Sequence, residues 1–228
     1  MTAVPTTMEL APTLHRWTAR HPSWHPAGAF GAEVASFALQ AGDDLLLIDP
    51  LVPEDGDVLA DLDALAGATP RTRVHILITI GYHARSAEPL SRRYAARIHG
   101  PHTVAGRLGD TSAFTILAPG TPGPAGVTAY AIGRPRRTEA PLWIPSHDAI
   151  AFGDALVTTP AGELRMWCPD KPSDRRRTFY RDRFAPTLQP LQQLPARRIL
   201  TTHGTPILDD GAAALAAALA AEPWFHHG

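Results

Sequence analysis

Cysteine and lysine are almost absent from this 228-residue sequence, and neither charge sign is in excess. Cys168 is the only cysteine, so no disulfide can form within one chain, and a lone thiol is typical of a reducing compartment. We therefore expect a cytoplasmic protein. The formal net charge of -1 leaves no global basic field, which disfavours sequence-independent binding to nucleic acid.

Long apolar runs are also absent. The most apolar stretch, residues 212–221, is about half as long as a membrane-spanning helix must be. The first thirty residues lack the basic segment and apolar core of a secretory signal. We expect no membrane partner. A chain of this length can bury a sizeable core without disulfides or a structural metal, so a single domain over residues 1–228 is expected.

Apolar patterns in the first half predict alternating strands and helices. Strands are predicted at 32–39, 45–48 and 74–80, and helices at about 58–65 and 86–96. The second half has short apolar runs separated by glycine and proline, which predict antiparallel strands. These strands are predicted at 114–117, 127–132, 142–144, 149–152 and 155–157, with a last strand at 198–201. Helices are predicted at 173–193, kinked near Pro186 and Pro190, and from residue 211 onward.

Four segments stand in an order that points to a known family. They are LLLIDP (45–50), ILITIGYHARSAEPL (76–90), LWIPSHDAIAFGDAL (142–156) and RILTTHGTP (198–206). Together they resemble the metallo-β-lactamase superfamily. The resemblance implies an α/β (α+β) fold, a four-layer αββα sandwich, with its site at the strand ends along one edge of the two sheets. It also implies that residues 166–193 form a helical lid insertion.

The metal motif of that superfamily is degenerate in this sequence. Family members follow the threonine with His-x-His-x-Asp-His, whereas Thr79 is followed by IGYHAR, which changes every ligand position. The next family ligand aligns with Gly133 and Arg134. Only Asp154 and His203 stand where the family keeps ligands. We therefore expect no metal cofactor; the alternative is one zinc ion held by His83, Asp154 and His203.

Arginines stand near the lost ligand positions and suggest that fixed positive charge has replaced the metal. A guanidinium cannot lose its proton to bind a metal, but it binds carboxylate or phosphate well. We expect Asp154 to pair with Arg85 or Arg134. We also expect Arg85, Arg134 and Asp154 to form a substrate-binding site in which the arginines bind an anionic group. Arg136 and Arg137 are expected on a solvated loop; the alternative is that they also bind the anionic group.

His203, at the end of a predicted strand, is the first candidate for general acid or base catalysis. His83 is the second candidate, with Tyr82 beside it as a possible proton donor. The alternative for each histidine is a packing or backbone-bonding role. His21 and His25 have no counterpart in the family, so no role is expected for them. No nucleophile motif surrounds the serines or Cys168, so nothing supports covalent catalysis.

Three functions follow from these residues. The first is a metal-independent hydrolase-like enzyme acting on a small anionic or ester- or lactone-like substrate. The second is a single-metal hydrolase that uses His83, Asp154 and His203. The third is a non-catalytic ligand-binding or scaffold protein. In the first function the partner is a small anionic molecule, and we expect no nucleic acid.

Overall fold

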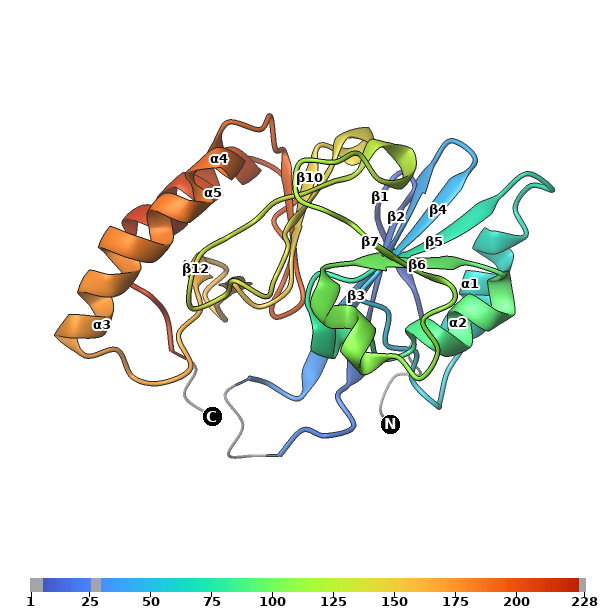
Figure 1. The fold of residues 1–228 in the computed structure, drawn as a ribbon, viewed down its shortest axis with the longest axis horizontal. Coiled ribbons are helices and arrows are strands. Elements are labelled where there is room, and N and C mark those ends of the chain that lie inside the picture. Colours follow the sequence, from blue (N-terminus) through green and yellow to red (C-terminus); the bar gives the residue numbers. More distant parts are fainter. Residues whose placement is uncertain (1–5, 26–29, 226–228) are drawn as a thin grey trace.

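Two β-sheets lie face to face in the centre of the molecule, and helices cover both outer surfaces (Figure 1). This arrangement is seen in a computed structural model, which describes residues 6–25 and 30–225. It confirms the predicted α/β class and the four layers of the sandwich.

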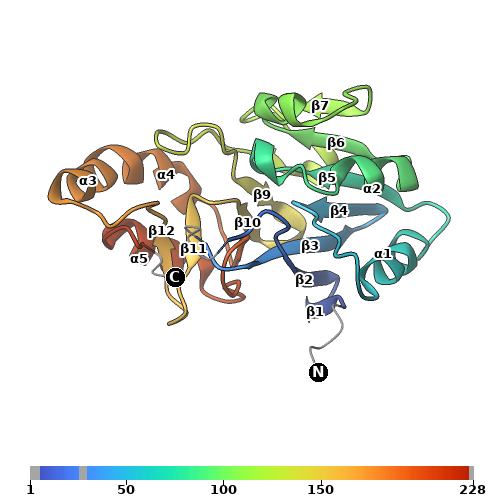
Figure 2. The same cartoon turned by 90° about the horizontal axis from the view of Figure 1, so that it is seen from below.

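The first sheet contains seven strands that lie side by side in the order of the sequence (Figure 2). The first four strands are antiparallel, and β4 to β7 are parallel. The strands are β1 (Met8–Ala11), β2 (Leu14–Arg20), β3 (Glu33–Ala41), β4 (Asp44–Ile48), β5 (Arg73–Leu77), β6 (Arg97–Gly100) and β7 (Phe114–Ile116). Parallel neighbours require crossover connections, and helices α1 (Val58–Ala66) and α2 (Ala87–Tyr94) lie in two of them.

The second sheet has the strand order β13, β10, β9, β8, and β11 with β12 forms a separate two-stranded ribbon. The bounds are β8 (Thr128–Ala129), β9 (Leu142–Ile144), β10 (Ala149–Phe152), β11 (Leu156–Thr158), β12 (Leu164–Met166) and β13 (Arg198–Thr201). Strands β10 and β13 are parallel to each other. Their carboxyl ends therefore lie at the same edge of the sheet.

Three helices accompany the second sheet: α3 (Asp174–Phe179), α4 (Ala185–Gln192) and α5 (Gly211–Ala220). A π-helical turn, Tyr180–Phe184, joins α3 to α4, so the predicted helix at 173–193 is one continuous but irregular segment. Within the described residues, no helix combines the length and the apolar character needed to cross a membrane.

The described residues form three large apolar clusters, one at each interface between layers, and one small further cluster. Leu46 and Leu142 belong to the cluster between the two sheets. Leu62 of α1 belongs to the cluster between the first sheet and its helices, and Leu188 of α4 and Leu215 of α5 belong to the cluster of the second sheet and its helices. Each layer is therefore held to the next by buried apolar contact, which is the main favourable contribution to folding.

The sequence patterns missed four strands: β1, β2, β6 and β12. These strands are short or contain His, Arg and Thr, so their apolar alternation is weak. The predicted strand at 127–132 is reduced to Thr128–Ala129, and the strand predicted at 74–80 ends at Leu77. Beyond Leu77 the chain leaves the sheet and enters a 3₁₀ turn at Gly81–His83, which carries site residues.

The segment predicted as a lid is firmly attached to the core. Tyr180, Phe184 and Leu188 are fully or almost fully buried in the cluster that also contains Phe152 of β10. Residues 174–192 form α3, α4 and the turn between them, and a helical lid insertion over residues 166–193 stays a prediction.

Gly204 follows His203 directly and allows a tight backbone contact at the end of β13. Its φ is +87°, and a Cβ at this position would overlap the carbonyl group of Thr158. The neighbouring amide of Thr158 donates to the carbonyl of His203 over 3.0 Å. Together these contacts fix the backbone that carries the His203 side chain.

We therefore expect Gly204→Ala to lower the free energy of unfolding by more than about 2 kcal/mol, because both the positive φ and the backbone overlap oppose a methyl group. Urea unfolding measures the change. Gly106→Ala is the matched control, since a Cβ there meets nothing within 4 Å. Equal unfolding midpoints for the two variants would contradict this account of Gly204.

Candidate functional site

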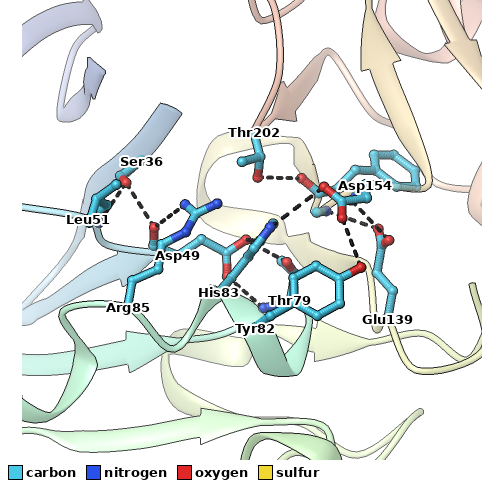
Figure 3. Close-up of polar contacts among 12 residues, drawn as sticks. Ser36, Asp49, Leu51, Thr79, Tyr82, His83, Arg85, Glu139, Asp154 and Thr202 are labelled. Atoms are coloured by element: carbon cyan, nitrogen blue, oxygen red, sulfur yellow. Dashed lines mark hydrogen bonds and ion pairs between the residues drawn. The ribbon is translucent and has the colours of Figure 1, made fainter. Parts of the chain in front are cut away.

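The candidate site lies where the carboxyl ends of four strands meet, two from each sheet (Figure 3). Asp49 follows β4, and the segment 79–85 follows β5. Asp154 follows β10, and His203 follows β13. Ligands in α/β sheets generally bind outside the carboxyl ends of strands, so the position is suited to function.

Asp49 is a buried carboxylate that organises the loop after β5. Its Oδ1 accepts a hydrogen bond from the amide of Thr79 over 2.8 Å, and its Oδ2 accepts one from the Thr79 hydroxyl. The same Oδ2 lies 2.9 Å from Nδ1 of His83. On the other side, the Ser36 hydroxyl donates to the Asp49 carbonyl and accepts from the amide of Leu51. Sequence analysis gave Asp49 no role, although an acidic residue directly after a buried strand can indicate a site residue at the end of that strand.

His83 lies between two buried carboxylates. Because Nδ1 faces Asp49, that nitrogen carries a proton and donates a hydrogen bond to the carboxylate. The other nitrogen, Nε2, lies 3.6 Å from Oδ1 of Asp154. The His83 ring is therefore oriented by Asp49 toward Asp154, as in a base held by a third group.

Asp154 is 2% exposed and is surrounded by donors and positive charge. The Tyr82 hydroxyl donates to its Oδ2 over 2.9 Å, and Nε2 of His203 lies 3.4 Å from its Oδ1. Nη1 of Arg136 is 3.9 Å from Oδ2. Burial alone would raise the pKa of Asp154, but His83, His203 and Arg136 outweigh burial and hold that pKa well below its usual range. The carboxylate is thus kept ionised.

Glu139 fixes the backbone of Asp154. Its two carboxyl oxygens accept hydrogen bonds from the amides of Gly153, over 2.9 Å, and Asp154, over 3.0 Å. Burial, and then the charge of Asp154, raise the pKa of Glu139 to about 8. Glu139 is therefore a further buried acid beside the site, and sequence analysis did not identify it.

The arginine that approaches Asp154 is Arg136, and the predicted partners Arg85 and Arg134 were wrong. Arg134 is exposed and does not line the pocket. Arg136 was expected in solvent, but its side chain is 12% exposed and its guanidinium lies 4.0 Å from the centre of the Trp167 ring. Arg137 is exposed, as expected. The turn at residues 133–137 therefore presents a different arginine from the one that the alignment indicated.

Arg85 lines the pocket without pairing with a carboxylate. Its Nη1 donates to the Asp49 carbonyl over 3.2 Å, and its Nε is buried without a hydrogen-bond partner. No Asp or Glu oxygen lies within 4.0 Å of its guanidinium nitrogens in the part of the chain that the structure describes. Burial lowers the pKa of Arg85, and the charges of Asp49 and Asp154 raise it by less than burial lowers it.

His203 is held between Asp154 and an aromatic stack. Its ring lies 3.8 Å from that of Phe30 at an interplanar angle of 4°, and Phe30 stacks in turn on Trp167 at 4.0 Å. Burial lowers the pKa of His203, which favours the neutral ring, although Asp154 acts in the opposite direction. Because Nε2 faces Asp154, Nδ1 is the nitrogen left free to accept a proton.

A pocket with a volume of about 420 Å³ opens over these groups. It brings together five of the predicted site residues: Tyr82, His83, Arg85, Asp154 and His203.

The pocket also has a wall that sequence analysis missed. His21, Trp24, His25 and Phe30 line it from the segment between β2 and β3. No apolar periodicity marks this Pro- and Gly-rich segment, so only its aromatic residues could have suggested a wall.

The residues present do not fit the zinc set that the resemblance implies. Nε2 of His83 and of His203 both approach Oδ1 of Asp154, an oxygen that is buried without a hydrogen bond. However, no three His, Cys, Asp or Glu side chains within residues 6–25 and 30–225 are grouped so that they can hold a metal ion. Ile80 and Ala84 have no ligand atoms at two family positions, and Arg85 brings a positive charge to a third.

Replacing Asp49 with Asn should lower the free energy of unfolding by about 2 to 4 kcal/mol, because the buried donors of Thr79 and His83 lose an ionised acceptor. Chemical denaturation measures the loss. Asp43→Asn provides a matched control, since Asp43 is exposed in the turn before the same strand, β4. A loss below about 1 kcal/mol for Asp49→Asn would show that the loop does not depend on this carboxylate.

Sequence comparison gives no relative: no protein-family model and no curated protein matches the chain. Comparison with solved structures gives many matches. The metallo-β-lactamase DIM-1 matches with a TM-score of 0.65 and 9% identity, over 96% of this chain and 98% of that chain. A metallo-β-lactamase from Pontibacter korlensis has a TM-score of 0.64 and 14% identity, over 96% and 100% of the two chains.

A third match is the flavodiiron core of Flv1 from Synechocystis sp. PCC6803, with a TM-score of 0.64 and 15% identity. It covers 96% of this chain and 60% of that chain. Identities this low show the fold and leave activity open. The chain has the metallo-β-lactamase fold.

Proposed function

We propose that this protein is a metal-independent enzyme that hydrolyses a small anionic substrate with an ester or lactone bond. The observation that carries the proposal is the guanidinium of Arg85, which lines the same pocket as His203 and has no carboxylate partner. A buried cation that lacks an anion is stabilised when a ligand supplies one. Arg85 would therefore bind the anionic group of the substrate.

His203 would act as the general base. Its Nδ1 takes a proton from a water molecule while the water oxygen attacks the carbonyl carbon. The bond from that carbon to the leaving oxygen then breaks, and the proton passes from His203 to the leaving group. Asp154, ionised and 3.4 Å from Nε2, stabilises the positive charge on the ring between these steps.

Tyr82 and His83 would support this step through Asp154. The Tyr82 hydroxyl binds one carboxylate oxygen, and His83 lies near the other. Tyr82 is 46% exposed, so it can also meet a substrate that enters the pocket. In this proposal, both residues keep the carboxylate turned toward His203.

The single-metal alternative rests on one observation, the approach of both histidine Nε2 atoms to Oδ1 of Asp154. In that function His83, Asp154 and His203 would be ligands. Activity would then disappear after treatment with a chelator and return with metal. A third outcome, ligand binding without turnover, would favour the binding protein.

The test is a screen of esters, thioesters, lactones and phosphoesters with chelator-treated protein. For the best substrate, His203→Ala should lower kcat by about 100- to 10,000-fold, because the proton acceptor is lost. Arg85→Gln should mainly raise KM, by about tenfold or more, because it removes ground-state and transition-state binding alike.

His102→Ala is the control, since this histidine is exposed and does not line the pocket. Small and equal effects of the His203 and Arg85 substitutions would place the chemistry elsewhere. Activity that depends strictly on added metal would contradict the metal-independent proposal.

A further inference from the structure

We infer that the ligand of this pocket is a flat aromatic carboxylate, with its carboxylate on Arg85 and its ring stacked on Trp24. The inference rests on the proposed anion pocket and specifies the class of molecule that the pocket takes. It follows from the hydrogen-bond donors that remain free in the pocket lining and from the contacts that fix its aromatic rings.

The free donors fit a single carboxylate. Arg85 uses one Nη1 hydrogen bond on the Asp49 carbonyl, and its Nε is unpartnered. A guanidinium with donors to spare matches the two oxygens of a carboxylate. The other arginine near the site, Arg136, also has an unpartnered Nε, but it lies 3.9 Å from Asp154 and over the Trp167 ring and does not line the pocket. One available guanidinium balances a monoanion better than the double charge of a phosphate monoester.

His21 adds a second donor on the same side. Its Nδ1 accepts a hydrogen bond from the amide of Ser23 over 3.2 Å, so the proton of the neutral ring lies on Nε2. His21 lines the pocket. Burial lowers the pKa of its ring most, and the nearby charge of Arg85 lowers that pKa further. A carboxylate between the two residues would therefore receive donors from both.

The aromatic part of the pocket lining consists of rings that contacts hold in place. Trp24 donates from Nε1 to the Phe30 carbonyl over 2.9 Å, and the guanidinium of Arg20 lies 4.9 Å from the centre of the Trp24 ring. Phe30 is stacked between His203 and Trp167, so both of its faces are covered and only its edge can meet a ligand. A flat ring stacks well on a fixed planar surface such as the Trp24 indole, and a puckered ring has fewer contacts there. A volume of about 420 Å³ suits a ligand of one ring with small substituents.

Calorimetric titration with three probes tests the inference. Benzoate is flat and charged, cyclohexanecarboxylate is charged but not flat, and benzamide is flat but neutral. We expect wild-type protein to bind benzoate at least about tenfold more tightly than either of the others. Arg85→Gln should abolish this binding, and Arg85→Lys should retain part of it, because lysine keeps the charge without the planar fork.

Trp24→Leu should reduce the preference for benzoate over cyclohexanecarboxylate while binding of both remains. Arg71→Gln and Phe179→Leu are the matched controls, since both residues lie outside the pocket lining. The three-probe comparison on unmodified protein decides the question even if an Arg85 variant fails to fold.

The contrary outcomes bear differently on the aromatic class of the ligand, on the anion pocket and on the enzyme. Equal binding of benzoate and cyclohexanecarboxylate, both lost in Arg85→Gln, would overturn the aromatic class and leave the anion pocket standing. Benzamide bound as tightly as benzoate, or no binding of any probe, would overturn the class and the anion pocket together. Benzoate binding without hydrolysis of any ester would support the class and contradict the enzyme.

Discussion

The buried carboxylate of Asp154 needs compensating charge, and most of the site is arranged to provide it. An ionised carboxylate removed from water is strongly unfavourable unless it is paired and hydrogen-bonded. Here His83, His203 and Arg136 surround the two oxygens, and Glu139 holds the backbone behind them. Because His83, Asp154 and His203 line the pocket and Arg136 borders it, the charge compensation of the buried carboxylate and the shape of the pocket depend on the same contacts.

The topology of the two sheets makes this arrangement possible. Strands β4 and β5 are parallel, and so are β10 and β13, so four carboxyl ends reach one edge. The amide of Ala35 in β3 also donates to the carbonyl of Thr202, which ties the first sheet to the end of β13. Residues that are more than a hundred positions apart in the sequence therefore meet at fixed distances.

Apolar runs were sufficient to predict the strands that build this edge, including β10 and β13 with their observed bounds. The positions of Asp154 and His203 at strand ends followed from the same patterns. These patterns could not predict that Arg136, and not Arg134, approaches Asp154, because the conformation of an irregular turn decides which side chain points inward. His21, Trp24 and Phe30 were also missed, since their role depends on contacts with residues such as His203 that are distant in sequence.

The central claim is that protein charge has taken the place of a metal at Asp154. Elemental analysis of the protein purified without chelators, and with zinc, iron and manganese present during growth, tests this claim most directly. We predict a content of each metal far below one ion per chain, unchanged in Asp154→Ala and His203→Ala. Near-stoichiometric zinc, iron or manganese that is lost in either variant would contradict the account.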